Sequence, residues 1–180
     1  AAIFAFKGDV YRALEAHSLS EEQLCFANEH LRILSGLYGI IRPFDKIMPY
    51  RLEMGTPLKF NGYSNLYEFW GAKLTEGLSR ELSEHKNKAL VNLASEEYSK
   101  AVPLDKLPEN IRVVQVFFKE FRNGKYKIIG TNAKRARGYM SRYIIENSID
   151  EVESLKDFSA QGYEFNAYLS DDNNFVFTKG

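Results

Sequence analysis

RVVQVFFKEFRNGKYKIIGTNAKRARGYMSRY, the run of residues 112–143, contains a predicted β-hairpin followed by a predicted helix. The hairpin is indicated by two segments rich in β-branched and aromatic residues, with Asn123-Gly124 between them. Asn-Gly readily adopts the positive φ values of a two-residue type I′ turn, so it is a strong hairpin signal. This turn places Glu120 opposite Lys127, which gives the only acid of the run a basic cross-strand neighbour.

The helix is indicated by small and apolar residues three and four positions apart, which form one stripe. The stripe consists of Ala133, Ala136, Met140, Tyr143 and Ile144. Thr131 or Asn132 is expected to cap the helix, because a side-chain oxygen there accepts from a free N–H of the first turn. The flank of the stripe carries Lys134, Arg137 and Ser141, with Arg135 and Arg142 nearby.

Basic residues dominate this run, with nine Lys or Arg against one acid, a net charge of +8 in a chain whose total is zero. Lys134, Arg135 and Arg137 lie in the first turns of the predicted helix, where the helix dipole favours acids. Each misplaced exposed charge costs about 0.3–1 kcal/mol. Free N–H groups at a helix start, together with Lys and Arg, form an anion site, so the conflict favours phosphate binding. The alternative is a solvated basic helix with scattered acidic partners.

The composition is that of one ordinary globular domain, or of one larger domain without a part of it: 180 residues, 44% apolar and 27% charged. The sequence contains neither a membrane-spanning run nor a signal-peptide pattern. A single cysteine, Cys25, excludes an internal disulfide and fits the cytoplasm. Residues 144–180 hold eight acids and two bases, a net charge of −6. This acidic tail either packs beside the basic run or faces away from it and steers an anionic ligand.

Strands and helices interleave along the rest of the chain, so we expect an α+β fold: a mixed β-sheet with hairpins and with helices packed around it. The chain starts abruptly with AAIFAF, residues 1–6, which read as a buried strand and suggest that the sequence begins inside a domain. Ser20 and Gln23 form a capping box that opens a helix. Further elements are a long helix over 66–85, a short helix that begins at Ser95 with this residue as its cap, a buried strand over 89–93, and a strand pair at 162–165 and 174–177.

No catalytic or metal motif is recognisable. The histidines are scattered and Cys25 lies five residues before His30, so no pair has ligand spacing, and neither a P-loop nor a dinucleotide fingerprint occurs. The acids that a metal-dependent nuclease centre would need are Asp9, Glu53, Glu96 and Glu97, and their spacing does not bring them together. The residues alone favour a binding protein over an enzyme, with no cofactor and no metal.

Two glycines within LSGLYGIIRP, residues 34–43, indicate a tight backbone path. Helix-hairpin-helix modules hold a DNA phosphate on the N–H groups of an apolar-x-Gly-apolar-Gly hairpin, and Ser35, Gly36 and Gly39 are a possible turn of this kind. The match is imperfect because Tyr38 is inserted, and a packed glycine-rich turn is the alternative. Two cations, at 42 and 51, are expected in loops.

Several blocks, taken together and in order, resemble the YaaA family of bacterial cytoplasmic proteins tied to peroxide stress. They are FKGDVY (6–11), LRILSGLYG (31–39), RP (42–43), PYRLEMG (49–55), FWG (69–71), NLAS (92–95), AKRARG (133–138) and IIEN (144–147). The resemblance covers nearly the whole chain. It implies one family-specific domain over residues 1–180 that lacks a further N-terminal segment with a Ser-Pro-Ala-Lys motif.

The resemblance also implies a DNA-binding protein with a positively charged cleft and a helix-hairpin-helix element, linked to DNA repair and to limiting damage from iron and peroxide. We expect contacts to the phosphates of double-stranded or structured DNA, largely without sequence specificity. The expected contacts are Lys134, Arg135, Arg137 and Arg142, helped by Lys7, Arg42 and Arg51. No membrane partner is expected, and the sequence predicts no oligomeric state.

Two other functions stay open. One is an enzyme that acts on a phosphorylated or nucleic-acid substrate, with Lys7, Asp9, Arg51 and Glu53 in the same cleft as the basic helix and one carboxylate as base. The other is an iron-sequestering protein, which requires at least three converging His, Cys or carboxylate ligands. Each function predicts a different arrangement of side chains in the folded protein.

Overall fold

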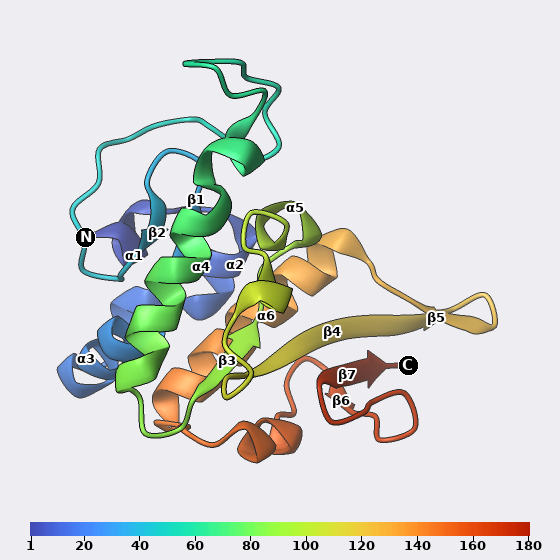
Figure 1. The fold of residues 1–180 in the computed structure, drawn as a ribbon. Helices are drawn as coiled ribbons and strands as arrows, with labels where there is room; N and C mark the ends of the chain where they lie inside the picture. Colours follow the sequence, from blue (N-terminus) through green and yellow to red (C-terminus); the bar gives the residue numbers. More distant parts are fainter.

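The computed structural model describes all residues, Ala1–Gly180. The predicted α+β class is confirmed, because helices surround a mixed sheet and a separate small hairpin (Figure 1). The elements in chain order are α1 (Ala2–Ala5), α2 (Asp9–Leu14), η1 (Ala16–Ser18), α3 (Glu21–His30), β1 (Ile33–Ser35), β2 (Gly39–Ile41), α4 (Leu66–Glu84), β3 (Ala89–Asn92), α5 (Glu96–Ser99), η2 (Leu104–Lys106), β4 (Arg112–Arg122), β5 (Lys125–Lys127), α6 (Gly130–Glu146), η3 (Val152–Asp157), β6 (Glu164–Phe165) and β7 (Asn174–Lys179). No helix is both long and apolar enough to cross a membrane.

The long strand β4 forms the centre of the main sheet. The strand order is β3-β4-β7-β6, with β3 and β7 parallel to β4, β6 antiparallel to β7, and β5 paired to the far end of β4 as a hairpin. Asn123 and Gly124 have φ values of 52° and 79°, as a type I′ turn requires, and Glu120 lies opposite Lys127. The predicted hairpin and its register are therefore confirmed. β3 pairs with β4 alone, so its outer edge borders the helices rather than another strand.

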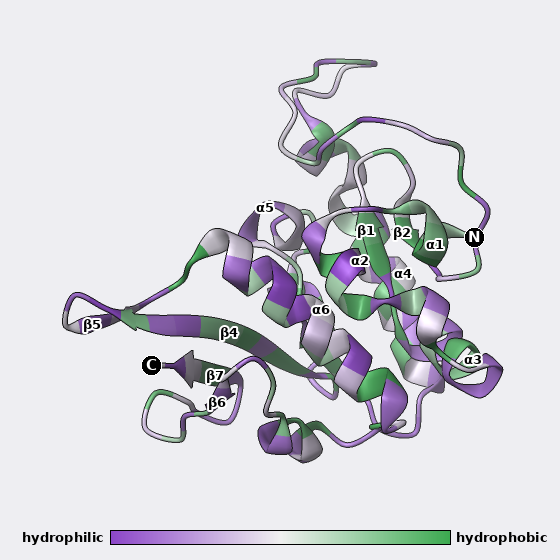
Figure 2. Cartoon of the chain, turned by 180° about the vertical axis from the view of Figure 1, so that it is seen from behind, coloured by the Kyte–Doolittle hydropathy of each residue, from purple (hydrophilic) through white to green (hydrophobic).

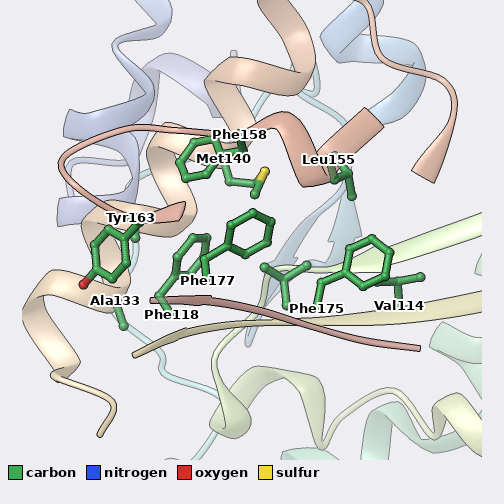
Figure 3. Close-up of a cluster of buried hydrophobic side chains, with 11 residues drawn as sticks. Val114, Phe118, Ala133, Met140, Leu155, Phe158, Tyr163, Phe175 and Phe177 are labelled. Atoms are coloured by element: carbon green, nitrogen blue, oxygen red, sulfur yellow. The ribbon is translucent and has the colours of Figure 1, made fainter. Parts of the chain in front are cut away.

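Helix α6 covers one face of the sheet and α4 lies against the other. On the α6 side, Ala133, Ala136 and Met140 pack against inward-facing side chains of β4 and β7, and the predicted apolar stripe is confirmed. Figure 3 shows Phe118 and Phe177 among these side chains, close together beneath the helix. On the other face, the leucines of α4 pack with partly buried residues of β3 and β4. Successive side chains of a strand point to opposite faces, so the strands contribute apolar side chains to both faces of the sheet.

Helix α2 packs closely on α6, as Figure 2 shows from behind. Gly138 makes this approach possible, because a Cβ atom there would overlap the carbonyl oxygen of Val10 and would lie 2.7 Å from the Cβ of Ala13. The contact fixes the start of α2 beside the middle of α6. These two segments form adjoining walls of the candidate site.

Three expectations about local structure were wrong. Residues 1–6 do not form a strand: Ala2–Ala5 is a short helix, held by backbone bonds from Ala2 to Asp45 and from Ile3 to Pro43. Helix α6 begins at Gly130 with no side-chain cap, earlier than expected. The short helix α5 begins after Ser95 as expected, but the Ser95 hydroxyl does not cap it.

Asn132, one of the expected caps, instead donates to the buried carboxylate of Glu120 at 2.6 Å. Glu120 also accepts from Arg122 at 2.8 Å and from the hydroxyl of Tyr163 at 2.9 Å. Burial opposes the ionisation of Glu120, but these hydrogen bonds outweigh it and lower the pKa of the carboxyl. Glu120 is therefore satisfied by these three groups, although Lys127 is its partner in the strand register.

Most other expected elements are confirmed. Ser20 and Gln23 form the reciprocal capping box at the start of α3. The long helix appears as α4 with a kink at Gly71. The strand expected at 89–93 appears as β3, but its residues are half-buried and not buried, because its outer edge lies against the cleft. The expected final strands appear as the antiparallel pair β6 and β7.

Candidate functional site

A cleft of about 920 Å³ runs along the outer edge of β3. Its walls come from α2, α3, α4 and α6, and its middle is largely apolar. At the carboxyl end of β3 the lining becomes polar, and we call this part the polar end of the cleft. Its members are Asp9, Tyr11, Tyr50, Glu53, Ser95, Glu97, Tyr98, Lys134 and Arg137. The crevice beyond the carboxyl ends of parallel strands is where ligands bind in open α/β sheets, so the position itself suits a site.

Lys134 and Arg137 contribute the cations of the polar end. They lie three residues apart on α6, and both side chains line the cleft, as their shared flank of the apolar stripe predicted. Neither side chain has a carboxylate or another hydrogen-bonding partner in the fold. Arg137 is half-buried, and this burial lowers the pKa of its guanidinium, although arginine stays charged. An unpaired, half-buried cation is unfavourable unless an anion joins it, so Arg137, with the exposed Lys134 beside it, is suited to an anionic ligand.

The other two predicted cations of α6 have different surroundings. Arg142 donates to the carbonyl oxygens of Leu14 at 3.0 Å and Glu15 at 3.2 Å and to the Ser18 hydroxyl at 2.8 Å. It also pairs with Glu146 at 2.7 Å. These contacts connect α6 to the end of α2, so Arg142 stabilises the packing of the two helices. Arg135 is exposed and does not line the cleft.

The three predicted cations outside α6 do not line the cleft either. Lys7 and Arg51 are exposed, although neighbours of both in the sequence do line it. Arg42 pairs with Glu81 at 3.2 Å in a polar hollow that adjoins the opposite end of the cleft. Burial opposes the ionisation of Glu81, but ion pairs with Arg32 and Arg42 lower the pKa of this carboxyl. Arg42 is thus part of a structural ion-pair network.

The predicted glycine turn lies between strands β1 and β2, and therefore in a β-hairpin rather than between two helices. A Cβ atom at Gly36 would lie 2.5 Å from the Leu52 carbonyl oxygen, and one at Gly39 would lie 2.8 Å from the Trp70 ring. The Trp70 indole N–H donates to the Gly36 carbonyl at 2.9 Å, and the Tyr38 N–H donates to Ser35 Oγ at 3.0 Å. Close packing accounts for both glycines. A phosphate contact at this turn stays a prediction.

Three tyrosines of the polar end were missed by sequence reasoning. Tyr11, Tyr50 and Tyr98 approach one another: burial, and then the nearby phenols of Tyr50 and Tyr98, raise the pKa of Tyr11. The pKa of Tyr98 is raised by burial and by Glu97, with smaller contributions from Tyr50 and Glu53. Each tyrosine lies within three residues of an acid that also lines the cleft, a signal that the sequence contained.

Three of the four acids considered for a nuclease centre line the polar end. Glu97 accepts from the N–H of Gly55 at 2.9 Å, Asp9 lies 3.8 Å from Arg12, and Glu53 has no partner. The fourth, Glu96, faces away and pairs with Lys100 at 2.9 Å. No cluster of His, Cys and acids has the geometry to hold a metal ion. The enzyme hypothesis placed Asp9, Glu53, Lys7 and Arg51 in one cleft with the basic helix, and the fold brings only the two acids there.

Comparison with known proteins gives consistent matches. A family described as "Peroxide stress protein YaaA" matches residues 1–169. A UPF0246 protein of Clostridium botulinum is 50% identical over 177 residues, which cover 98% of this chain and 69% of that protein. A UPF0246 protein of Saccharophagus degradans is 50% identical over 178 residues, covering 99% and 69% of the two chains. One from Crocosphaera subtropica is 48% identical over 179 residues, covering 99% and 71%.

Proposed function

This chain belongs to the YaaA family of peroxide stress proteins, and we propose that it serves the peroxide response by binding DNA phosphates at the polar end of its cleft. The observation that carries this proposal is the pair of unpartnered cations, Lys134 and Arg137, on one face of α6. We assign the protein to the cytoplasm, where bacterial DNA is found. The single exposed cysteine, Cys25, is compatible with this compartment because thiols stay reduced there.

A phosphate would compensate the two unpaired cations directly. The first turn of α6, residues 130–133, does not line the cleft, so the side chains of Lys134 and Arg137, and not the free N–H groups of the helix start, would hold the anion. The planar guanidinium of Arg137 can donate two parallel hydrogen bonds to a phosphate, and Lys134 adds a second charge beside it. A bound phosphate therefore compensates charges that the fold itself leaves unpaired.

The contacts fall into three groups under this proposal. Lys134 and Arg137 are the principal phosphate contacts. Arg135, Lys7 and Arg51 are exposed and free to add outlying contacts with neighbouring phosphates. The two remaining predicted cations, at 42 and 142, are engaged in ion pairs of the fold, so under this proposal they are not principal phosphate contacts. Phosphate contacts carry no base information, so binding is largely independent of sequence, as suits the protection or repair of DNA under peroxide.

Fluorescence anisotropy with two labelled duplexes of unrelated sequence tests this proposal. Wild-type protein is expected to bind both with similar affinity. Lys134→Ala/Arg137→Ala is expected to weaken both to the same degree, with Arg135→Ala as the matched charge control on the same helix. Equal binding by the wild type and the double variant would remove these residues from the interface, and strong preference for one duplex would point to base recognition instead.

A second candidate function is an enzyme acting on a phosphorylated or nucleic-acid substrate in the same cleft. It is favoured by the unpaired carboxylate of Glu53 and by Asp9, which lie at the same end as the two cations. A carboxylate near a bound phosphate ester is placed to act as a general base. Under this function, wild-type protein converts a phosphorylated substrate and Glu53→Gln does not. An absence of turnover on nucleotides, oligonucleotides and sugar phosphates would leave the binding function alone.

A further inference from the structure

The wall that faces α6 at the polar end is made of phenols and carboxylates. The ring of Tyr11 stacks on Phe6 with centroids 5.0 Å apart, and Phe6 also meets the edge of Tyr50 at 6.3 Å. The hydroxyls of Tyr11, Tyr50 and Tyr98 are close enough to influence one another electrostatically. The carboxylates of this wall repel a phosphate, so the wall is suited to a different part of the ligand.

Some groups on this wall are held by the fold and others are free. The Tyr50 hydroxyl lies 2.5 Å from Ser35 Oγ, and Glu97 accepts from the backbone N–H of Gly55, so these two side chains are fixed. By contrast, the Tyr11 hydroxyl, the Glu53 carboxylate and the Ser95 hydroxyl have no hydrogen-bond partner in the fold. The wall therefore presents a rigid aromatic frame together with one free acceptor and two free hydroxyls.

The chemistry of the unpaired groups indicates which features a ligand must have. The cations on α6 require an anionic end, such as a phosphate. The carboxylate of Glu53 requires N–H or O–H donors at the other end, and the aromatic frame favours a flat ring. A nucleotide has all three features, because its base is planar and, in adenine, cytosine and guanine, carries an exocyclic amino group. The polar end is one part of the cleft, whose whole volume of about 920 Å³ lies within the range of small-molecule sites.

We propose that the polar end of the cleft binds one nucleotide, with its phosphate on Lys134 and Arg137 and its base against Tyr11, Tyr98 and Glu53. This inference rests on the proposed function and extends it from phosphates to the base. The nucleotide has two possible sources: a nucleotide turned out of bound DNA, or a free mononucleotide. Proteins that take a base out of the stack hold it with aromatic side chains and hydrogen bonds to its edge, which is the arrangement on this wall.

The first arm of the test uses a duplex with 2-aminopurine at one position, because the fluorescence of this base rises when it leaves the stack. At saturating protein, monitored by anisotropy on the same sample, wild-type protein is expected to raise the fluorescence. Tyr11→Phe and Glu53→Gln are expected to reduce that rise. Glu96→Gln is the matched acidic control, because Glu96 lies outside the cleft.

The second arm measures free dAMP, 2′-deoxynebularine monophosphate and inorganic phosphate by calorimetry. If the source is a free nucleotide, dAMP binds more tightly than either of the others, since the purine base of deoxynebularine has no exocyclic amine and no other N–H donor. Glu53→Gln replaces a charged hydrogen bond by a neutral one, which is expected to weaken dAMP binding by about tenfold. The affinity for deoxynebularine monophosphate is expected to change much less.

The outcomes separate the two proposals. A bound duplex with unchanged 2-aminopurine fluorescence, together with equal affinity for dAMP, deoxynebularine monophosphate and phosphate, overturns the nucleotide site and leaves the phosphate function standing. A duplex that does not bind removes the DNA-binding function, and the calorimetric arm then decides the nucleotide site by itself. A fluorescence rise that Tyr11→Phe and Glu53→Gln leave intact places the extruded base elsewhere and also contradicts the inference.

Discussion

Helix α6 carries two kinds of cation that differ in their neighbours. Arg142, near its end, reaches two backbone carbonyls, a hydroxyl and Glu146, and its side chain is only 21% exposed. Lys134 and Arg137, in its first half, line the cleft without any partner. The two kinds are indistinguishable by residue type or by local charge density. What the fold places opposite a cation, rather than the number of cations, decides whether it is available to a ligand.

The same division extends to the whole basic run of residues 112–143. Glu153 and Glu146 of the acidic tail pair with Arg112 and Arg142 at 2.8 and 2.7 Å. The tail therefore packs beside part of the basic run, which is one of the two arrangements that its charge allowed. The charge excess that remains is concentrated on the hairpin and on the first turns of α6.

Arg142→Ala is expected to have the largest effect on stability. It removes several charged hydrogen bonds and leaves the carbonyls at the end of α2 without their donor, so the free energy of unfolding should fall by about 3 kcal/mol. Urea denaturation measures this. A loss below about 0.5 kcal/mol, the range of ordinary surface substitutions, would show that Arg142 is not a structural cation.

Arg137→Ala is expected to act on binding instead. DNA affinity should fall by about 1.5–3 kcal/mol, roughly ten- to a hundredfold in Kd, because a charged hydrogen bond to phosphate is lost. The free energy of unfolding should stay the same or rise slightly, since an uncompensated, half-buried charge disappears. Anisotropy and urea denaturation of the same preparation measure both. Arg137→Lys should recover only part of the affinity, because an ammonium group cannot form the bidentate contact.

Glu120→Gln removes the negative charge of the buried acid at the base of the hairpin. Arg122 forms an ion pair with this acid at 2.8 Å. The folded-state pKa of Glu120 is lowered, so its contribution to stability is present above its unfolded value of about 4.3 and is lost as pH falls through the lower folded value. The variant should lose about 1–2 kcal/mol at pH 7, because charged hydrogen bonds become neutral.

Unfolding free energies measured at several pH values test this linkage. The wild type should lose more stability than Glu120→Gln as the pH falls below about 4.3. Parallel pH profiles for the two proteins would contradict the assignment.

Arg135→Ala is expected to have the smallest effect. Its side chain is exposed and does not line the cleft, so the free energy of unfolding should change by less than about 0.5 kcal/mol. Its contribution to DNA binding should be visible at low salt alone, because exposed charges are screened. An effect as large as that of Arg137→Ala would remove the distinction between cleft-facing and outward-facing cations.

The parts of the fold that short-range chemistry determines were predictable. Asn123-Gly124 sets a turn type and hence a strand register, and the Ser20 capping box starts a helix wherever the chain goes. The prediction of a strand at residues 1–6 was wrong because a short apolar run is equally compatible with a strand and with a buried helix. Their backbone bonds to Pro43 and Asp45 decide between the two, and these partners lie about forty residues away.

The candidate site was predictable to a lesser degree. Helical periodicity placed Lys134 and Arg137 on one flank of α6, and the fold confirms that both line the cleft. The pairing of Arg42 with Glu81 and the convergence of Tyr11 with Tyr98 depend on distant segments. The residue spacing within one segment does not predict contacts between distant segments, so these contacts could be identified only from the structure.

The salt dependence of DNA binding tests the role of the unpaired cations most directly. Anisotropy titrations of wild type and Lys134→Ala/Arg137→Ala would be measured over a range of salt concentrations, with Arg142→Ala under folding conditions as the structural control. Each phosphate contact contributes about −0.9 to the slope of log K against log salt, so the double variant should have a slope shallower by roughly two. Arg142→Ala should keep the wild-type slope. A double variant with the wild-type slope and affinity would show that Lys134 and Arg137 contact no phosphate.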